Sequence, residues 1–329
     1  MNTKKLRIGV LGCSSFAMRS VLPTIKIMHE QFELVAVASR SIKKATKFAE
    51  TLDVKKSFSS YNDLIDMDNL DAVYIPLPNS LHFMWVEKSL KKKLHVFVEK
   101  SMACTYDEVK YLNELASINK CVLVENFHFR FHNQLSTIKK IVADGIIGEL
   151  RCVRSSFGFP PFSDNDNIRY KKELGGGALY DAGAYPIKIA QIFLGNEIDI
   201  SAANLYFDKI RGVDLWGGAY LTNKKTEQFA EIAFGFDNFY QCNLELWGSK
   251  GKIHTDRIFT APPRYGTKIM VELSSGNEVI DVEPCNHYKN ILFHFYKLVC
   301  TQKDISIEYF DNINQARLLT EVSNIASNN

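Results

Sequence analysis

Short apolar runs alternate with amphipathic segments over the first 125 residues. The runs are rich in Val, Ile and Leu, and each is about 4–6 residues long, as buried parallel strands are. They cover residues 6–11, 33–38, 71–75, 95–98 and 121–124, with helical patterns between them at 16–29, 42–52, 80–91 and 106–119. We expect Asn79 to cap the third helix, and Thr105 with Glu108 to form a capping box on the fourth. This alternation predicts a doubly wound α/β sheet with right-handed crossovers.

The pattern changes after about residue 130. Long runs typical of antiparallel strands cover residues 149–159, 213–222, 228–236 and 239–247, with turn candidates at 235–238 and 248–251. A helix is expected at 135–143, a Gly-rich loop with a helix within 169–195, and two final helices at 287–300 and 312–326. We therefore expect an α/β domain over residues 1–125 and a second domain over 126–329, built on an open, mostly antiparallel sheet.

Composition narrows the function classes. The 329 residues are 46% apolar and 23% charged, which is ordinary globular usage. The net charge of +3 is spread along the chain, whereas a nucleic-acid-binding protein usually clusters its basic residues. No apolar stretch reaches the length of a membrane span. The seven cysteines are scattered and show no C-x-x-C spacing, which indicates thiols in a reducing compartment and predicts a cytoplasmic protein.

A candidate phosphate loop follows the first strand. Dinucleotide-binding turns read G-x-G-x-x-G/A, for a tight turn, a close approach to the pyrophosphate and close helix–strand packing. Gly12 and Ala17 fit the first and third roles, while Ser14 stands in the middle and its hydroxyl can add a donor. A lone Gly-rich turn is often only a turn, but here a strand precedes it and a helix follows. We expect the loop Gly12, Cys13, Ser14, Ser15, Phe16 and Ala17 to bind a dinucleotide.

The end of the second strand bears on which dinucleotide is bound. NAD enzymes place a carboxylate there for the ribose 2′-hydroxyl, but this chain has Ser39-Arg40-Ser41, with Lys43 and Lys44 following. A guanidinium with hydroxyls suits a 2′-phosphate through charge-assisted hydrogen bonds, which predicts NADP(H). The alternative is that Arg40 is a solvated residue at a helix start.

Two further segments carry candidate chemistry. Glu99-Lys100-Ser101 follows the fifth strand, at the sheet edge where doubly wound folds bind ligands. Asp181 and Tyr185 lie four apart after three glycines, which on a helix places both on one face. A Lys, an Asp and a Tyr that meet at a cofactor would form a proton-transfer set. Taken singly, a Lys after a strand is usually at the surface and a helical Tyr is usually core.

These residues carry a family resemblance over essentially the whole length. The shared motifs, in order, are the G-x-x-G-C start, Pro78-Asn79-x-x-His82, Glu99-Lys100, Glu125-Asn126-Phe127, Gly145-x-x-Gly148-Glu149-Leu150, the triple-Gly helix, Gly212-Val213-Asp214 and Trp247-Gly248-x-x-Gly251. The chain resembles the Gfo/Idh/MocA oxidoreductases. Within them it is most similar to NADPH-dependent 3-ketoreductases of nucleotide-linked deoxysugars, through residues 9–17, Leu22-Pro23, 73–79 and 157–161.

The resemblance implies roles for individual residues. It implies that Lys100 lies beside the nicotinamide and the substrate, and that Tyr185 donates or accepts the proton. Tyr185 replaces the His of the inositol-dehydrogenase branch, and Ser101 replaces the family's Pro, which removes a fixed φ. In the expected mechanism Lys100 stabilises the charge that grows on a ketone oxygen and lowers the pKa of Tyr185, while Asp181 holds Lys100 or a sugar hydroxyl.

The remaining expectations complete the site. Leu77, Pro78, Asn79, His82, Glu99, Lys100 and Asn126 join the phosphate loop, Ser39, Arg40 and Lys44 as cofactor-binding residues, and Lys100, Arg130, Arg169, Asp181 and Tyr185 bind substrate. The alternative for His82 is a helix-start residue on the apolar face. His128 and His132 are spaced as metal ligands sometimes are, but no carboxylate or Cys completes a set, so we expect no metal.

Three functions remain open on the sequence. The leading one is an NADPH-dependent reductase of the C3 ketone of a nucleotide-linked deoxysugar. The others are an NADP-dependent aldose or dihydrodiol dehydrogenase, and a dinucleotide sensor without enzymatic activity, against which Lys100 and Tyr185 argue. An antiparallel sheet with one uncovered apolar face predicts a homodimer or homotetramer, with the face from Phe229 to Trp247 as its core.

Overall fold

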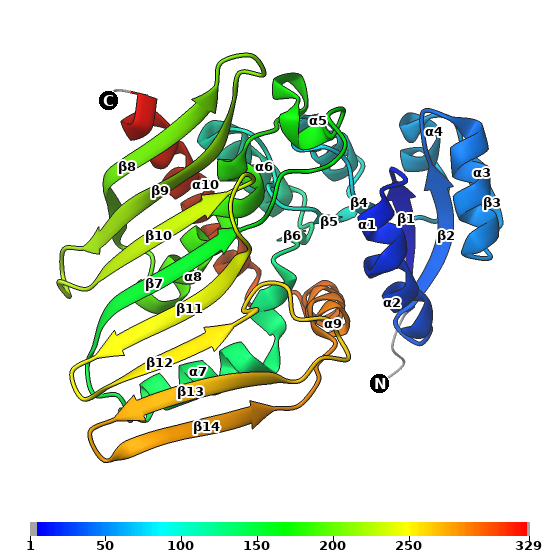
Figure 1. Cartoon of the computed structure of the whole chain (residues 1–329). Helices are drawn as coiled ribbons and strands as arrows, with labels where there is room; N and C mark the ends of the chain where they lie inside the picture. Colours follow the sequence, from blue (N-terminus) through cyan, green and yellow to red (C-terminus); the bar gives the residue numbers. More distant parts are fainter. Residues whose placement is uncertain (1–4, 328–329) are drawn as a thin grey trace. The chain divides into compact units, whose positions relative to one another are not determined.

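The structure is a computed structural model that describes residues 5–327, and it consists of two compact units (Figure 1). Unit 1 extends to Phe127 and includes Tyr288–Ile313; unit 2 comprises His128–His287 and the chain from Asn314 on. The first boundary lies beside the predicted one. The return of residues 288–313 to unit 1 was not predicted, and it follows from aromatic packing: Phe295 contacts Phe97 at 5.6 Å between ring centroids.

Unit 1 is built on a six-stranded parallel sheet with the order β3-β2-β1-β4-β5-β6. Its strands are β1 (Leu6–Leu11), β2 (Phe32–Ala38), β3 (Lys56–Phe58), β4 (Ala72–Ile75), β5 (His95–Val98) and β6 (Leu123–Glu125). Its helices are α1 (Ser15–Arg19), α2 (Val21–Ile27), α3 (Ile42–Thr51), α4 (Tyr61–Ile65), α5 (Asn79–Lys91), α6 (Tyr106–Ile118), α9 (His287–Thr301) and the start of α10 (Ile305–Ser327). The predicted doubly wound sheet is confirmed, and all its strands end at one edge in the parallel sense.

The helix caps and helix bounds predicted for unit 1 agree with the structure only in part. The capping box of Thr105 and Glu108 on α6 is confirmed. The cap predicted for Asn79 is wrong, because Pro78 is the cap residue of α5 and makes no side-chain cap bond. The first predicted helix is divided into α1 and α2, because Ser20 leaves helical geometry with φ −127°.

Unit 2 is built on an eight-stranded sheet with the order β14-β13-β12-β11-β7-β10-β9-β8. The strands are β7 (Leu150–Gly158), β8 (Ile198–Asp208), β9 (Val213–Asn223), β10 (Phe229–Gly235), β11 (Gln241–Gly248), β12 (Gly251–Asp256), β13 (Thr267–Leu273) and β14 (Gly276–Val282). The helical segments are η1 (His128–Phe131), α7 (Asn133–Ala143), η2 (Ile168–Tyr170), η3 (Lys172–Leu174), η4 (Leu179–Gly183), α8 (Ala184–Leu194) and the end of α10.

The sheet of unit 2 is mostly antiparallel, as predicted. The exception is β10, which runs parallel to β7. The turn predicted at 235–238 follows β10 and precedes β11, yet these two strands do not pair, because β7 lies between them. The turn at 248–251 does join paired neighbours, β11 and β12.

Helices cover one face of this sheet. In Figure 1 the strands lie in front of α7 and α8, and α8 contacts β7 and β10 while α7 contacts β13. The opposite face turns toward the viewer. Among the described residues it carries exposed aromatic side chains, including Tyr206, Trp216 and Trp247.

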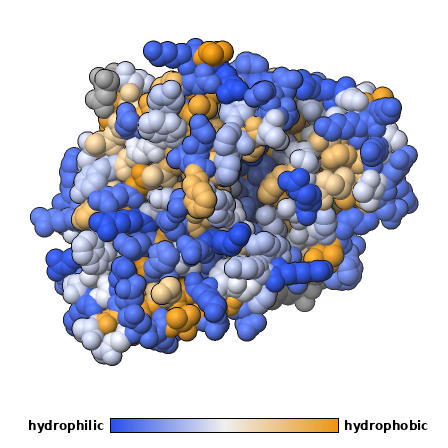
Figure 2. All heavy atoms as spheres, in the orientation of Figure 1, coloured by the Kyte–Doolittle hydropathy of each residue, from blue (hydrophilic) through white to orange (hydrophobic). Residues whose placement is uncertain are grey.

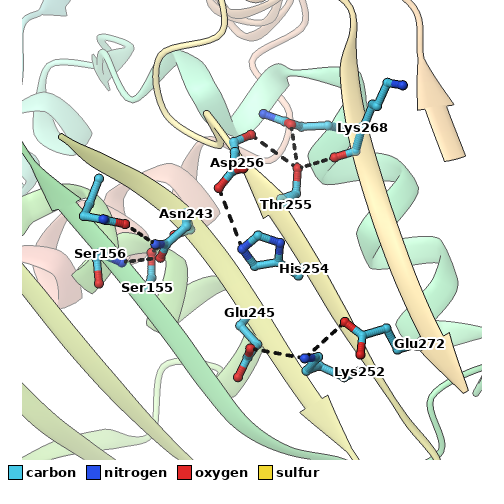
Figure 3. A network of polar contacts seen from close by, with 12 residues as sticks. Ser155, Ser156, Asn243, Glu245, Lys252, His254, Thr255, Asp256, Lys268 and Glu272 are labelled. Carbon is cyan, nitrogen blue, oxygen red and sulfur yellow. Dashed lines mark hydrogen bonds and ion pairs between the residues drawn. The ribbon is translucent and has the colours of Figure 1, made fainter. Parts of the chain in front are cut away.

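The exposed face is not uniformly apolar. Arg154 pairs with Glu231 at 2.6 Å and Glu245 at 3.2 Å. Lys252 lies between Glu245 and Glu272 and extends this row of ion pairs, as Figure 3 shows. In Figure 2, seen from the same side as Figure 1, apolar atoms form separate patches among hydrophilic ones. Aromatic and charged positions therefore share the face, with the pattern set by the two-residue period of the strands.

No helix within residues 5–327 has the length and apolar character needed to cross a bilayer.

Candidate active site

The phosphate loop has the geometry that its sequence predicts. Gly12 adopts φ +117°, and its amide donates to Ala38 O at 2.9 Å, which ties the turn to β2. Ser14 is the N-cap of α1, since its Oγ accepts from Ala17 N at 3.0 Å. Ala17 is fully buried, as close helix–strand packing requires. Burial raises the pKa of the Cys13 thiol to about 11, so this side chain stays neutral.

The end of β2 offers cations and hydroxyls. Ser39 is buried, Arg40 is exposed, and Ser41 caps α3 by accepting from Lys44 N at 3.4 Å. Burial raises the pKa of the adjacent Tyr61, and the positive charge of Arg40 opposes this effect. The corner Ser39-Arg40-Ser41 contains no carboxylate, so the residues present fit a phosphorylated dinucleotide better than a ribose diol.

His82 lies deeper than a ligand-binding residue would. Its ring has no exposed surface, and its nitrogens lie 2.7 Å from Ser101 O and 2.8 Å from Leu77 O. Burial lowers the pKa of His82 to about 4. The ring therefore holds the loop after β4 to the loop after β5, and direct contact with a cofactor stays a prediction.

Glu99 anchors the loop that carries Lys100. Tyr74 Oη donates to Glu99 Oε1 at 2.6 Å, and Asn126 Nδ2 donates to the same oxygen at 2.7 Å. Removal from water raises the pKa of Glu99, against the hydrogen bonds and the nearby Lys100 charge, which lower it. Asn126 is fully buried, so it supports Glu99, and its predicted contact with the cofactor is not tested by this geometry. Lys100 is half-buried beside them.

In unit 2 the Gly-rich segment leads into a π-helical turn. Gly177 adopts φ +115°, and η4 follows as a π-helix that carries Asp181, with Tyr185 in the first turn of α8. The buried carboxylate of Asp214 on β9 accepts from Leu179 N at 2.6 Å and fixes the start of this segment. Burial raises the pKa of Asp214 to about 6. Short π-helices inside α-helices occur often at functional sites.

Asp181 and Tyr185 share a neighbour in Arg169. The guanidinium of Arg169 pairs with Asp181, with Nε 2.5 Å from Oδ2. The charge of Asp181 raises the pKa of Arg169, and Tyr185 adds to this effect. The Tyr185 ring packs against Phe157 at 5.1 Å and Phe259 at 5.4 Å between centroids. Its ring is thus fixed by apolar contacts, and a cation lies near its polar end.

The remaining candidates, Arg130, His128 and His132, lie in and directly after η1, and the His128 ring contacts Tyr185 at 6.4 Å between centroids. The Arg130 guanidinium stacks over the Phe131 ring at 5.5 Å. His128 and His132 pack with His287, the first stacked at 4.6 Å, and burial lowers the pKa of His287 to about 3. Within residues 5–327 there is no group of three or more His, Cys, Asp or Glu side chains that could hold a metal ion.

The predicted residues thus form two sets in the structure, one within each unit. In unit 1 the phosphate loop, the Ser39–Arg40 corner, residues 77–79 and the Lys100 loop all follow strands of one parallel sheet. In unit 2 Arg169, Asp181 and Tyr185 form the second set. Sequence reasoning missed Tyr74, which donates to Glu99, and the roles of Glu125, which accepts from Met102 N at 2.7 Å, and of Asp214. The segment Gly212-Val213-Asp214, at the start of an apolar run, was the signal available for Asp214.

Comparison with family models covers both units. Residues 6–127 match the model described as "Oxidoreductase family, NAD-binding Rossmann fold", and residues 135–254 match the GFO/IDH/MocA C-terminal domain. The two matches together span more than half of the chain.

Relatives are similar over most of their length. A dTDP-3,4-didehydro-2,6-dideoxy-alpha-D-glucose 3-reductase from Saccharopolyspora spinosa is 39% identical over 82% of this chain and 80% of its own. Another of that name, from Streptomyces antibioticus, is 33% identical over 99% and 98%. The crystal structure of KijD10, a 3-ketoreductase from Actinomadura kijaniata in complex with NADP and TDP-benzene, has a TM-score of 0.94 at 31% identity, covering 98% of each chain. Family models and relatives agree, and the chain belongs to the GFO/IDH/MocA oxidoreductase family.

Proposed function

We propose that this chain is an NADP(H)-dependent reductase of the C3 ketone of a dTDP-linked deoxysugar. The observation that carries the proposal is the Lys100 loop, held after β5 in a sheet whose phosphate loop and Ser39–Arg40 corner suit a phosphorylated dinucleotide. The names of the relatives from Saccharopolyspora and Streptomyces supply the substrate class. Structures of KijD10 with a tyrosine-to-phenylalanine or a lysine-to-alanine substitution have the same fold as this chain.

The proposed division of labour follows the two units. Residues Gly12 to Ala17, Ser39, Arg40, Lys44 and residues 77–79 of unit 1 would hold the dinucleotide, with Glu99, His82 and Asn126 behind them. Arg169, Asp181 and Tyr185 of unit 2 would meet the sugar nucleotide, together with Arg130. When bound, reduced NADP supplies the hydride that the ketone carbon takes up.

The residues of the chain then act on the ketone oxygen. As the hydride arrives, negative charge grows on that oxygen, and the Lys100 ammonium stabilises it. Tyr185 gives up its phenolic proton to the same oxygen, so the carbonyl becomes a secondary alcohol. Asp181 is paired with Arg169, and a carboxylate held in this way can also accept a hydrogen bond from a sugar hydroxyl. Each of Lys100 and Tyr185 contributes about 10²–10⁴-fold to turnover in this scheme.

The direct test follows absorbance of the nicotinamide at steady state. NADPH oxidation with a dTDP-linked 3-keto-deoxysugar should be saturable and faster than NADP⁺ reduction with free xylose or a dihydrodiol. Lys100→Ala and Tyr185→Phe should each lower kcat far more than they raise the KM for NADPH. Faster turnover with the free sugar would favour an aldose dehydrogenase. Tight NADPH binding with no turnover in either direction would favour a dinucleotide sensor.

Two further proposals concern the setting of the enzyme. We propose a cytoplasmic location, since none of the seven cysteines forms a disulfide, as expected of a reducing compartment.

We also propose a homodimer or homotetramer formed through the exposed face of the eight-stranded sheet, whose aromatic side chains are costly to leave in water.

A further inference from the structure

Tyr74 is an unusual residue for its position. It lies in the middle of a parallel strand, β4, where both faces are covered and apolar residues are the rule. Its side chain has no exposed surface. A buried phenol needs a hydrogen-bond partner, and here the partner is the carboxylate of Glu99, 2.6 Å away. That length is typical of an O–H donor to an ionised carboxylate.

Glu99 links this phenol to Lys100. Besides Tyr74, its carboxylate takes a hydrogen bond from Asn126 Nδ2 at 2.7 Å, and the adjacent backbone of Lys100 lowers the pKa of Glu99. Burial raises the pKa of Glu99, and the positive charge of the neighbouring Lys100 opposes this effect. The orientation of the carboxylate therefore bears on both the backbone and the side chain of Lys100.

A second carboxylate holds the other side of the loop. Met102 N donates to Glu125 Oε1 at 2.7 Å, and Glu125 is 3% exposed. Ser101 lies between Lys100 and Met102, and its carbonyl oxygen lies 2.7 Å from His82 Nδ1. The Ser101 carbonyl and the Met102 amide are tied to side chains from α5 and β6, so these contacts hold the Lys100 loop, in which Ser101 stands where the family has a proline.

We propose that Tyr74 is a positioning residue, which orients the Glu99 carboxylate and through it sets the place of Lys100. The proposal rests on the proposed function, in which Lys100 stabilises the charge on the ketone oxygen. Tyr74 lies within the strand and does not itself meet the reactants. Its phenol stays a donor across the working range, because burial and Glu99 raise the pKa of Tyr74 well above its usual value.

The test is a double-mutant cycle on Tyr74→Phe and Lys100→Ala, measured as kcat for NADPH-dependent reduction of the dTDP-linked 3-keto-deoxysugar. Tyr74→Phe alone should lower kcat about tenfold with less than twofold change in the KM for NADPH, because a small displacement of a reacting group is costly. In the Lys100→Ala background the same substitution should change kcat less than twofold, while it lowers Tm equally in both backgrounds.

The matched control is Tyr111→Phe, which removes another phenol bonded to a carboxylate, Glu87 at 2.9 Å, on the surface of unit 1. It should leave kcat unchanged. An equal fall in kcat with and without Lys100, or no fall with Lys100 present, overturns the role of Tyr74. A Lys100→Ala enzyme with full kcat instead overturns the assignment of Lys100, and that single variant distinguishes the two failures.

A second measurement covers the case of Lys100→Ala variants too slow to assay. Trace acetic anhydride acetylates lysines at rates that depend on their surroundings. Mass spectrometry then compares the acetylation rate of Lys100 with that of exposed Lys47 in the same chain. Tyr74→Phe should change the Lys100 rate at least twofold and Tyr111→Phe should not. An unchanged rate in Tyr74→Phe overturns the proposal.

Discussion

At the scale of single residues, the site depends on where polar groups lie relative to the sheet. Lys100 and Tyr185 are half-buried and can meet a ligand. His82 and Asn126 are fully buried and bond to other parts of the chain. Sequence position placed all four near strand ends or helix starts, but only packing separates the half-buried residues, which a ligand can reach, from the buried residues, which support other parts of the chain.

At this scale, the proposed preference for NADP(H) depends on Arg40. Replacing Arg40 with Ala should raise the KM for NADPH about tenfold, because a charge-assisted bond to the 2′-phosphate is lost, and should change the KM for NADH less than twofold. Steady-state kinetics with both cofactors measures this. Lys47→Ala removes another exposed cation from α3 and is the control. Equal effects of Arg40→Ala on the two cofactors would refute the 2′-phosphate role.

At the scale of elements, local signals predicted most strands and helices but not their partners. The bounds of β1 and β5 and the capping box of α6 agree with the sequence patterns, since periodicity and caps act within a few residues. The insertion of β7 between β10 and β11 is a long-range pairing that no turn signal contains. The packing of Phe295 on Phe97 is equally remote along the chain. The π-helical turn at η4 has no sequence signature of its own.

Gly177, just before the π-helical turn η4, provides a prediction about stability. Gly177→Ala should lower the free energy of unfolding by about 3 kcal/mol, because Ala is strained at φ +115° and its Cβ would meet the Asp214 carboxylate. Gly145→Ala is the control, with φ +70° and nothing within 4 Å of the added Cβ, and should cost only about 1 kcal/mol. Urea denaturation followed by circular dichroism measures both. Equal losses would show that the contact with Asp214 is unimportant.

At the scale of the whole molecule, the near-neutral charge of +3 and the mixed exposed face of unit 2 suit association with copies of the same chain. Light scattering after gel filtration should give twice or four times the 37.5 kDa of one chain. Trp247→Glu should reduce that mass, since it places a charge among the aromatic residues of the face. Ile118→Glu alters an exposed apolar residue at the end of α6 in unit 1 and should leave the mass unchanged. A wild-type monomer at micromolar concentration would contradict the assembly.

The central claim is hydride transfer from NADPH to C3 of a nucleotide-linked ketosugar. Its most direct measurement uses NADPH deuterated at C4 of the nicotinamide, in both stereoisomers, with the dTDP-linked 3-keto-deoxysugar as the acceptor. Mass spectrometry and proton NMR of the product locate the label. The account predicts one deuterium at C3 of the sugar from one of the two stereoisomers, and none in the Lys100→Ala, Tyr185→Phe double variant over the same time. Deuterium at another sugar carbon, or unlabelled NADPH oxidation without sugar reduction, would contradict it.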